Sequence, residues 1–179
     1  MKNYPHWRQE LKSSQHREGN NPSSNWIQLA TNCECNEPKV RTVVFRGWLK
    51  ENSMLIFTDT RSGKVKDINH NNQVEVLWLL PKSKSQFRFK GYANIIDDNI
   101  SYWNNLSTTS RSSWFWPTPS EQFNEEDYKQ TKNSSIRPKN FAVYEIIVNK
   151  VELLKLERPY HKRYVWCKDN NWIRKRINP

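Results

Sequence analysis

From residue 26 onward the chain consists mainly of short segments that are rich in β-branched and aromatic residues and are separated by polar stretches. These segments read WIQLAT, VRTVVFRGWL, MLIFTDT, VEVLWLL, QFRFKGYANII, FAVYEIIVNKVELLKL and RYVWC. Such a composition is typical of strands. Because these segments do not alternate regularly with helices, they argue against a doubly wound sheet. They predict a mainly β (α+β) fold, a closed or nearly closed antiparallel barrel with short flanking helices.

The stretches between these segments predict short helices and one turn. Helices are expected over residues 4–17, 63–70, 97–106 and 120–129, the last of them opened by Pro119, Ser120 and Glu121. Near the carboxy terminus, Asp169, Asn170 and Asn171 are expected to form the turn of a hairpin.

The helix expected over residues 63–70 follows a serine. Ser62 is placed to cap it, because its hydroxyl would accept a backbone N–H of the first turn. Val65 and Ile68 lie three residues apart and would form the buried face. The start of this helix would therefore present free backbone N–H groups beside Ser62.

Glycine is scarce, which excludes several nucleotide-binding folds. The chain has only Gly19, Gly47, Gly63 and Gly91, and no two of them lie closer than sixteen positions. The dinucleotide-binding motif G-x-G-x-x-G and the P-loop motif both need closely spaced glycines, as does the nucleophile elbow G-x-S-x-G. Any phosphate must therefore be held by side chains and helix ends.

The composition suggests one domain whose core is completed by a partner. A chain of 179 residues suits a single domain, residues 1–179, rather than two. Only 35% of the residues are hydrophobic, but 13% are aromatic and nine are tryptophan. Burial must then depend on few, large side chains, which favours a homodimer. The net charge of +11 would attract anionic partners without choosing among them.

Nothing in the sequence predicts export or a membrane span. The amino-terminal residues are polar, and the longest apolar run covers residues 76–80. The three cysteines, Cys33, Cys35 and Cys167, are too few for a disulfide framework and are expected to be unpaired thiols in a reducing compartment. No metal site is expected, because a Cys-x-Cys pair without a second ligand pair matches zinc sites poorly. The expected location is the cytoplasm.

Hydroxyl and basic residues gather at one point of the predicted fold. A strand, the end of a second strand and a helix amino terminus would bring together Arg41, Thr58, Arg61, Ser62 and Lys64. The helix start supplies N–H groups and a positive dipole, and the cations supply charge-assisted hydrogen bonds. This set would hold a phosphate dianion. The alternative is that these cations are solvated ends of strands and helices.

Several ordered blocks at compatible spacing resemble the pyridoxamine 5'-phosphate oxidase superfamily, particularly its oxidase-related branch. The blocks are RTVVFRG, FTDTRSGK, Q-F-R-F-x-G, H-x-R and W-x-x-x-R-I-x-P. The resemblance covers roughly residues 25–86 and the last thirty residues. It implies an FMN-binding split β-barrel of antiparallel Greek-key type, in which two subunits of a homodimer share each FMN. It also implies an FMN-dependent oxidoreductase.

The resemblance assigns cofactor contacts by position. The segment from Arg41 to Arg46 would line the flavin and its phosphate arm, Ser62 and Lys64 would bind phosphate, and the remaining residues would add contacts. The implied FMN-binding residues are Arg41, Thr42, Val43, Val44, Phe45, Arg46, Phe57, Thr58, Arg61, Ser62, Lys64, Gln86 and Arg163. Gly63 stands where the family has an arginine, for which Arg61 is the candidate substitute.

The substrate-specific part of the family pattern is only partly present. The implied substrate contacts are Arg46, Ser110, Arg111 and His161. Leu106 stands where an arginine is expected, Leu154 where a flavin-contacting tryptophan is expected, and Pro159 opens a motif that keeps only its histidine and last arginine. His161 is a weak catalytic candidate, since a lone histidine before a strand is more often structural. The substrate cannot be read from these residues.

Two other functions remain open. A nucleic-acid-binding barrel would explain the charge and the tryptophans beside cations, namely Trp114, Trp116, Trp166 and Trp172. It would leave the ordered family blocks unexplained, so a nucleic-acid partner is not expected. A flavin carrier or sensor without turnover is a third possibility that is compatible with the sequence.

Overall fold

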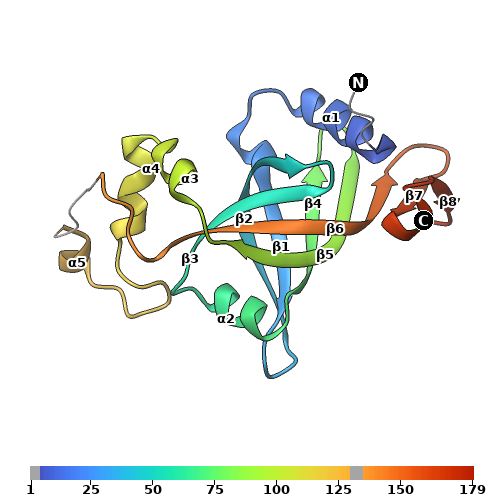
Figure 1. Cartoon of the computed structure of the whole chain (residues 1–179). Coiled ribbons are helices and arrows are strands. Elements are labelled where there is room, and N and C mark those ends of the chain that lie inside the picture. Colours follow the sequence, from blue (N-terminus) through green and yellow to red (C-terminus); the bar gives the residue numbers. More distant parts are fainter. Residues whose placement is uncertain (1–4, 130–134) are drawn as a thin grey trace.

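In the computed structural model, which describes residues 5–129 and 135–179, the strands form one antiparallel sheet that closes on itself (Figure 1). The strand order is β3-β2-β1-β4-β5-β6-β7-β8, and a further pairing between β3 and β6 closes the first six into a barrel. The strands are β1 (Trp26–Asn32), β2 (Pro38–Lys50), β3 (Ser53–Asp59), β4 (Gln73–Leu80), β5 (Ser85–Ile96), β6 (Phe141–Lys155), β7 (Lys162–Cys167) and β8 (Lys175–Ile177). The predicted closed antiparallel barrel with short helices is confirmed.

The helices are short and lie outside the barrel wall (Figure 1). They are α1 (His6–Glu18), α2 (Gly63–His70), α3 (Ile100–Asn104), α4 (Thr108–Ser112) and α5 (Glu125–Lys129), with 3-10 turns at Pro22–Asn25, Ser113–Phe115 and Lys168–Asn170. The helix predicted over residues 63–70 is confirmed with those bounds. The hairpin near the carboxy terminus is also confirmed, because β7 pairs with β8 in antiparallel fashion.

The barrel interior is filled by alternate residues of its strands and is closed at one end by α1. On β5, Phe87, Phe89, Gly91 and Ala93 are buried, whereas the intervening residues 88, 90 and 92 are more exposed, as the alternation predicts. Trp7 of α1 is fully buried and contacts Phe89 edge-on with ring centroids 5.8 Å apart. Trp7 and Leu11, the buried apolar residues of α1, therefore seal the core that the few, large aromatic side chains build.

A second apolar cluster lies outside the barrel, between its wall and the segment after β5. Leu55 and Val143 of the wall contact Trp103 of α3 and Phe141 in this cluster. Trp103 is fully buried and its indole N–H donates to the backbone oxygen of Ser135 at 2.8 Å. Trp114, in the segment that follows α4, contacts Phe141 with ring centroids 4.8 Å apart, so packing anchors that segment to the barrel.

Three local predictions at helix ends were wrong. The helix predicted over residues 97–106 covers only Ile100–Asn104. The Ser62 hydroxyl does not cap α2; it donates to the backbone oxygen of Asp59 at 2.7 Å and accepts from the Lys64 ammonium. The last predicted helix is shorter than expected and begins at Glu125. Ser120 has a φ of 71°, which is incompatible with a right-handed helix at that position.

The prediction of unpaired thiols was wrong for two of the three cysteines. Cys33 and Cys35 form a disulfide in the turn between β1 and β2, and only Cys167 is free. The tight turn brings their Cα atoms to 5.2 Å, within the usual range for a disulfide. The cysteine count therefore no longer supports a reducing compartment, and the cytoplasmic location stays a prediction. Among the described residues, no helix is long and apolar enough to span a membrane.

Candidate functional site

The turn from β3 to α2 gathers hydroxyl groups around one ammonium group. The Lys64 Nζ atom donates to Oγ1 of Thr58 at 3.0 Å and to Oγ of Ser62 at 2.9 Å. Thr58 ends the buried run of β3, and Ser62 precedes α2; both are buried. The short loop between β3 and α2 therefore places a strand residue and two helix-start residues within hydrogen-bonding distance of one another.

Within the described part of the chain, the hydrogen-bond partners of Lys64 are neutral. Burial lowers the pKa of Lys64, the charge of Arg41 lowers it further, and Asp59 opposes both effects. Among the residues that the structure describes, no ion pair to Lys64 is present, and its two hydrogen bonds go to hydroxyl oxygens. An ammonium group has three donors, so one remains for a further acceptor. A partly buried cation of this kind fits an anionic ligand, since an anion would supply the missing charge partner.

The two arginines predicted for the phosphate site are held by carboxylates. Arg41 forms an ion pair with Asp67 at 3.0 Å and donates to Oγ1 of Thr31 at 2.6 Å. Arg61 forms an ion pair with Asp59 at 2.7 Å and donates to the backbone oxygen of Trp116. Hydrogen bonds thus join Thr58, Ser62 and Lys64 directly. Arg41 lies close enough to lower the pKa of Lys64, whereas the Arg61 side chain binds Asp59.

The segment of β2 predicted to line the flavin lies next to this turn. Val43 and Phe45 pack against the barrel core, so Thr42, Val44 and Arg46 belong to the other face of the strand. The Arg46 guanidinium lies over the ring of Phe57, 5.3 Å from its centroid. Arg46 and Phe57 therefore form one cation–aromatic surface close to Thr58.

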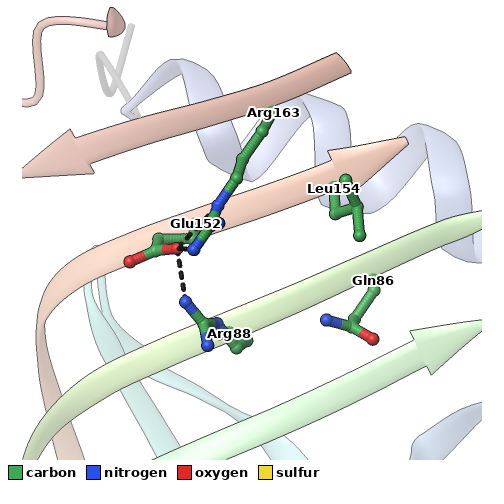
Figure 2. A pocket seen from close by; sticks show the side chains of 5 residues that line it. All are labelled: Gln86, Arg88, Glu152, Leu154 and Arg163. Carbon is green, nitrogen blue, oxygen red and sulfur yellow. Dashed lines mark hydrogen bonds and ion pairs between the residues drawn. The ribbon is translucent and has the colours of Figure 1, made fainter. Parts of the chain in front are cut away.

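A second candidate pocket, of about 100 Å³, lies on β5, β6 and β7 (Figure 2). Gln86, Arg88, Glu152, Leu154 and Arg163 line it. Two of these, Gln86 and Arg163, are predicted cofactor contacts, and both flank Leu154 in the sheet. Gln86, Leu154 and Arg163 therefore lie in one row across the sheet, and the pocket contains the last two residues of the predicted cofactor site.

Glu152 organises the cations of this pocket. Arg88 and Arg163 both donate to its Oε2 atom (Figure 2). The Lys150 ammonium lies 2.7 Å from its Oε1 atom. Burial alone would raise the pKa of Glu152, but hydrogen bonds from Lys150, Arg163 and Arg88 outweigh it and lower the pKa to about 2. One carboxylate thus holds three cations, which leaves the pocket with a positive balance. Glu152 was not predicted from the sequence, although a glutamate inside an apolar strand segment was the available signal.

The two groups of predicted cofactor residues lie far apart in one chain. Phe57 shares a row of the sheet with Val143 and Ile96, whereas Gln86 shares a row with Leu154. These rows cross β5 ten residues apart, which corresponds to roughly 30 Å along the strand. The β3–α2 turn and the Gln86 pocket are therefore at opposite ends of β5.

Among the described residues, the predicted substrate residues Ser110, Arg111 and His161 form hydrogen bonds within their own segments and none to Thr58, Ser62 or Lys64. Ser110 accepts a hydrogen bond from the Ser107 hydroxyl at 3.0 Å in α4. Arg111 donates to the backbone oxygen of Asn104 at 2.8 Å. His161 is exposed, and its Nδ1 atom lies 3.2 Å from the backbone oxygen of Glu157. Arg46 lies over the ring of Phe57, and Arg111 lies over the ring of Trp103, whose apolar cluster also includes Phe57.

Comparison with known proteins gives consistent matches. The family described as pyridoxamine 5'-phosphate oxidase, FMN-binding domain, matches residues 4–97. The chain is 32% identical over 136 residues to pyridoxine/pyridoxamine 5'-phosphate oxidase 2 of Arabidopsis thaliana, covering 69% of this chain and 68% of that protein. It is 26% identical over 169 residues to a pyridoxine/pyridoxamine 5'-phosphate oxidase of Leptospira biflexa, covering 87% and 79%.

A solved structure agrees over nearly the whole length. A pyridoxamine 5'-phosphate oxidase-related, FMN binding protein from Nostoc punctiforme superimposes with a TM-score of 0.89 at 28% identity, covering 99% of both chains. The matched family segment contains β1 to β5 and α2, and so includes the Lys64 turn and Gln86. The chain therefore belongs to the pyridoxamine 5'-phosphate oxidase, FMN-binding domain family.

Proposed function

We propose that the protein binds FMN at the interface of a homodimer and works as an FMN-dependent oxidoreductase. The observation that carries the proposal is the Lys64 ammonium, which has two hydroxyl partners and no carboxylate partner among the described residues. A phosphate monoester dianion supplies the acceptors and the charge that this group lacks. The solved relative from Nostoc punctiforme is named an FMN binding protein, which supports the choice of ligand.

The hydrogen-bond donors and the aromatic ring near Lys64 suit the phosphate and the flavin of FMN. Lys64, Ser62 and Thr58 would bind the phosphate, and the start of α2 adds backbone N–H groups with the positive end of the helix dipole. Arg46 and Phe57 would provide a cationic and aromatic surface beside it. When bound, the flavin would supply hydride acceptance, and the protein would mainly position the reactants.

The proposal of a homodimer follows from the distance between the two groups of residues. Gln86 and Arg163 lie roughly 30 Å along β5 from the row of Phe57, farther than one FMN extends. If both groups contact one FMN, they must come from two chains. The positive balance around Glu152 suits the same anionic cofactor from the partner side.

No proton-transferring residue is assigned. His161, the candidate named from sequence, is exposed and has its Nδ1 atom beside the backbone oxygen of Glu157. Leu154 lines the second pocket where the family resemblance expects tryptophan. We therefore propose that the main substrate is a small molecule other than the vitamin phosphates.

The visible absorbance spectrum of the freshly purified protein is the first test. Bound flavin gives the characteristic yellow chromophore, and the extracted cofactor identifies FMN by mass. The stripped protein should then bind FMN more tightly than riboflavin, which has no phosphate, by roughly ten- to a hundredfold. Equal affinity for both flavins would contradict the phosphate site, and absence of any flavin binding would contradict the proposal as a whole.

The same preparation separates the rival functions. A salt-dependent gel shift with single-stranded DNA or RNA, without flavin binding, would favour a nucleic-acid-binding barrel. Bound FMN that is neither reduced nor reoxidised by any electron donor or acceptor tried would favour a carrier or sensor. Reduction of the bound flavin by a substrate and its reoxidation would support the oxidoreductase.

A further inference from the structure

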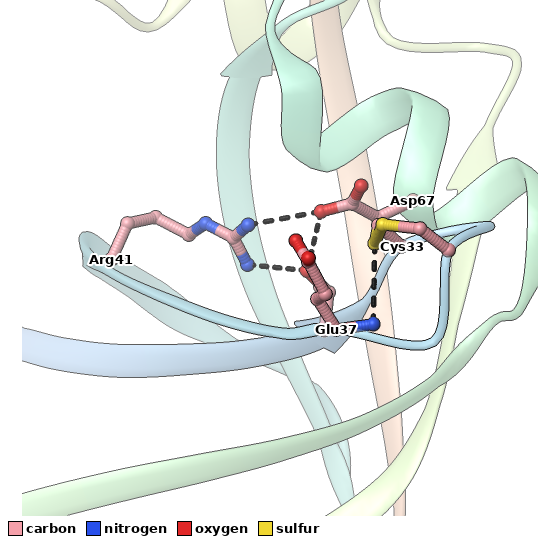
Figure 3. Close-up of a disulfide and its surroundings, with 6 residues drawn as sticks. Cys33, Glu37, Arg41 and Asp67 are labelled. Carbon is pink, nitrogen blue, oxygen red and sulfur yellow. Dashed lines mark hydrogen bonds and ion pairs between the residues drawn. A yellow bond between two sulfur atoms is a disulfide. The ribbon is translucent and has the colours of Figure 1, made fainter.

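The disulfide between Cys33 and Cys35 lies in the exposed turn that joins β1 to β2 (Figure 3). Its two sulfur-bearing residues differ in access. Cys33 is only 5% exposed, whereas Cys35 is exposed. An external thiolate therefore has more access to Cys35 than to Cys33.

Stability does not explain this disulfide. The turn is already held by backbone hydrogen bonds, from Cys33 N to the Glu37 oxygen at 3.1 Å and from Asn36 N to the Cys33 oxygen at 2.9 Å. The strands on both sides pair from Asn32 with Pro38 onward. A disulfide with a sequence separation of 2 closes so short a loop that it removes little entropy from the unfolded chain.

The surroundings of the disulfide favour exchange at Cys35 with Cys33 as leaving group. The backbone N–H of Glu37 donates to Sγ of Cys33 at 3.3 Å, and this donor would stabilise a thiolate there (Figure 3). The two cysteines line an open surface pocket of about 510 Å³ together with Glu34, Lys66, Asp67 and His70. The pocket is large enough to admit a thiol-bearing molecule.

The charges at this pocket are mixed. Lys66 and His70 of α2 face it, and Asp67 is neutralised by its ion pair with Arg41. Glu34 lines the pocket, and the Glu37 carboxylate lies within 4.8 Å of both sulfurs, so both oppose the approach of an anion. The access of Cys35 and the amide donor at Cys33 therefore decide the direction of attack.

We propose that Cys33–Cys35 is a thiol–disulfide exchange site that accepts two electrons from an external dithiol. A thiolate of the dithiol attacks Sγ of Cys35; the bond between the cysteines breaks, and its electron pair leaves on Sγ of Cys33. The second thiolate of the donor then attacks the mixed disulfide and releases Cys35. The donor becomes a disulfide, and its two protons end on Cys33 and Cys35. The proposal does not depend on flavin binding.

The first test uses the full-length chain with Cys167→Ser, so that only the pair can react. The air-oxidised protein is titrated with dithiothreitol without denaturant, and thiols are counted by the mass added by a maleimide. We expect two thiols to appear while the near-ultraviolet circular dichroism of the fold persists, and oxidised dithiothreitol to reverse the change. Reduction only in guanidinium, or free thiols in the air-oxidised protein, would overturn the proposal.

The second test distinguishes the two sulfurs. In the Cys167→Ser background, Cys33→Ser leaves Cys35 alone and Cys35→Ser leaves Cys33 alone, so the two variants are matched. We expect Cys35 to form a mixed disulfide with oxidised glutathione at least about tenfold faster than Cys33, because it is exposed. Equal rates, or a faster Cys33, would overturn the assignment of Cys35 as the attacked sulfur.

Discussion

The ammonium nitrogen of Lys64 lies 3.0 Å from Oγ1 of Thr58, and this contact links the start of α2 to the end of β3. If the pair binds the phosphate of FMN, Lys64→Ala should weaken FMN binding by roughly ten- to a hundredfold. One lost charge-assisted hydrogen bond costs about 1.5–3 kcal/mol. A flavin fluorescence titration of the stripped protein measures the change.

Lys90→Ala is the matched control for this substitution. Lys90 has the same charge and is exposed on β5. Its removal should change FMN affinity only slightly, through a screened long-range field. If both variants showed the same small and salt-sensitive loss, Lys64 would not be a phosphate ligand and general basicity would explain binding.

If FMN binds between subunits, a heterodimer of two chains that each carry a different site substitution should contain one intact FMN site. Lys64→Ala impairs the group near α2, and Arg163→Ala impairs the group at the second pocket. A heterodimer of these chains contains one site built from both intact halves and one site with both defects. We expect the differently tagged, co-expressed and doubly purified heterodimer to bind about one FMN with normal affinity, while each parent binds weakly.

The heterodimer experiment gives a different result if FMN does not bind between two chains. When each chain provides a complete site, every site in the mixture carries one defect and no normal affinity returns. Light scattering at micromolar concentration supplies the control, because an FMN-loaded monomer would contradict the two-chain site directly.

Much of the fold could be predicted because it follows local rules. Alternation placed Phe87, Phe89 and Ala93 inside the barrel, and spacing placed Val65 and Ile68 on the buried face of α2. The same reasoning brought Thr58, Ser62 and Lys64 together, since a strand end followed by a short loop must deliver its residues to the helix start. These predictions depend only on residues that are close to one another along the chain.

The remainder could not be predicted because it depends on partners distant in sequence or on details of a turn. Arg61 forms an ion pair with Asp59, and Arg41 forms one with Asp67. The predicted phosphate site included neither carboxylate. Glu152 meets Arg88 only through the register of β5 and β6. The cysteine pair depends on the turn geometry, which a count of cysteines does not contain.

Turnover of pyridoxamine 5'-phosphate should be weak or absent. Leu106 stands where the family pattern has an arginine, and in this structure it packs against the apolar cluster around Trp103. Loss of one charge-assisted contact to a substrate phosphate corresponds to roughly ten- to a hundredfold in affinity. Formation of pyridoxal 5'-phosphate by the FMN-loaded protein is the measurement. Turnover equal to that of a dedicated oxidase would show that Leu106 and Leu154 do not matter.

Gly91 should be essential to the barrel for steric reasons. A Cβ atom there would lie 2.0 Å from the backbone oxygen of Ile147, at the register shift between β5 and β6. Gly91→Ala should therefore lower the free energy of urea unfolding by about 1–3 kcal/mol or more. Gly63→Ala is the control, because no atom lies within 4 Å of its Cβ position at the start of α2. It should be neutral or stabilise by up to about 1 kcal/mol; equal losses in both variants would contradict the argument.

The ion cluster around Glu152 should make stability depend on pH in a defined window. The pKa of Glu152 falls from 4.5 to about 2 on folding. A depressed carboxyl pKa stabilises the fold fully above the unfolded value, and the contribution is lost as pH falls through the folded value. Glu152→Gln should therefore lower the free energy of unfolding at pH 7 by about 3 kcal/mol at most. By pH 3 the deficit should be roughly halved.

Urea unfolding of the wild-type protein and Glu152→Gln at pH 7, 5 and 3 tests this pH dependence. Glu75→Gln is the control, because Glu75 also lies near Arg88, at 3.6 Å, but its side chain is 44% exposed. An exposed ion pair contributes about 0–1 kcal/mol, so that variant should show a small deficit. A Glu152→Gln deficit that stays constant from pH 7 to pH 3 would contradict the model of a charged carboxylate, because it would mean that Glu152 stabilises the sheet by packing and not by its ion pairs with Arg88 and Arg163.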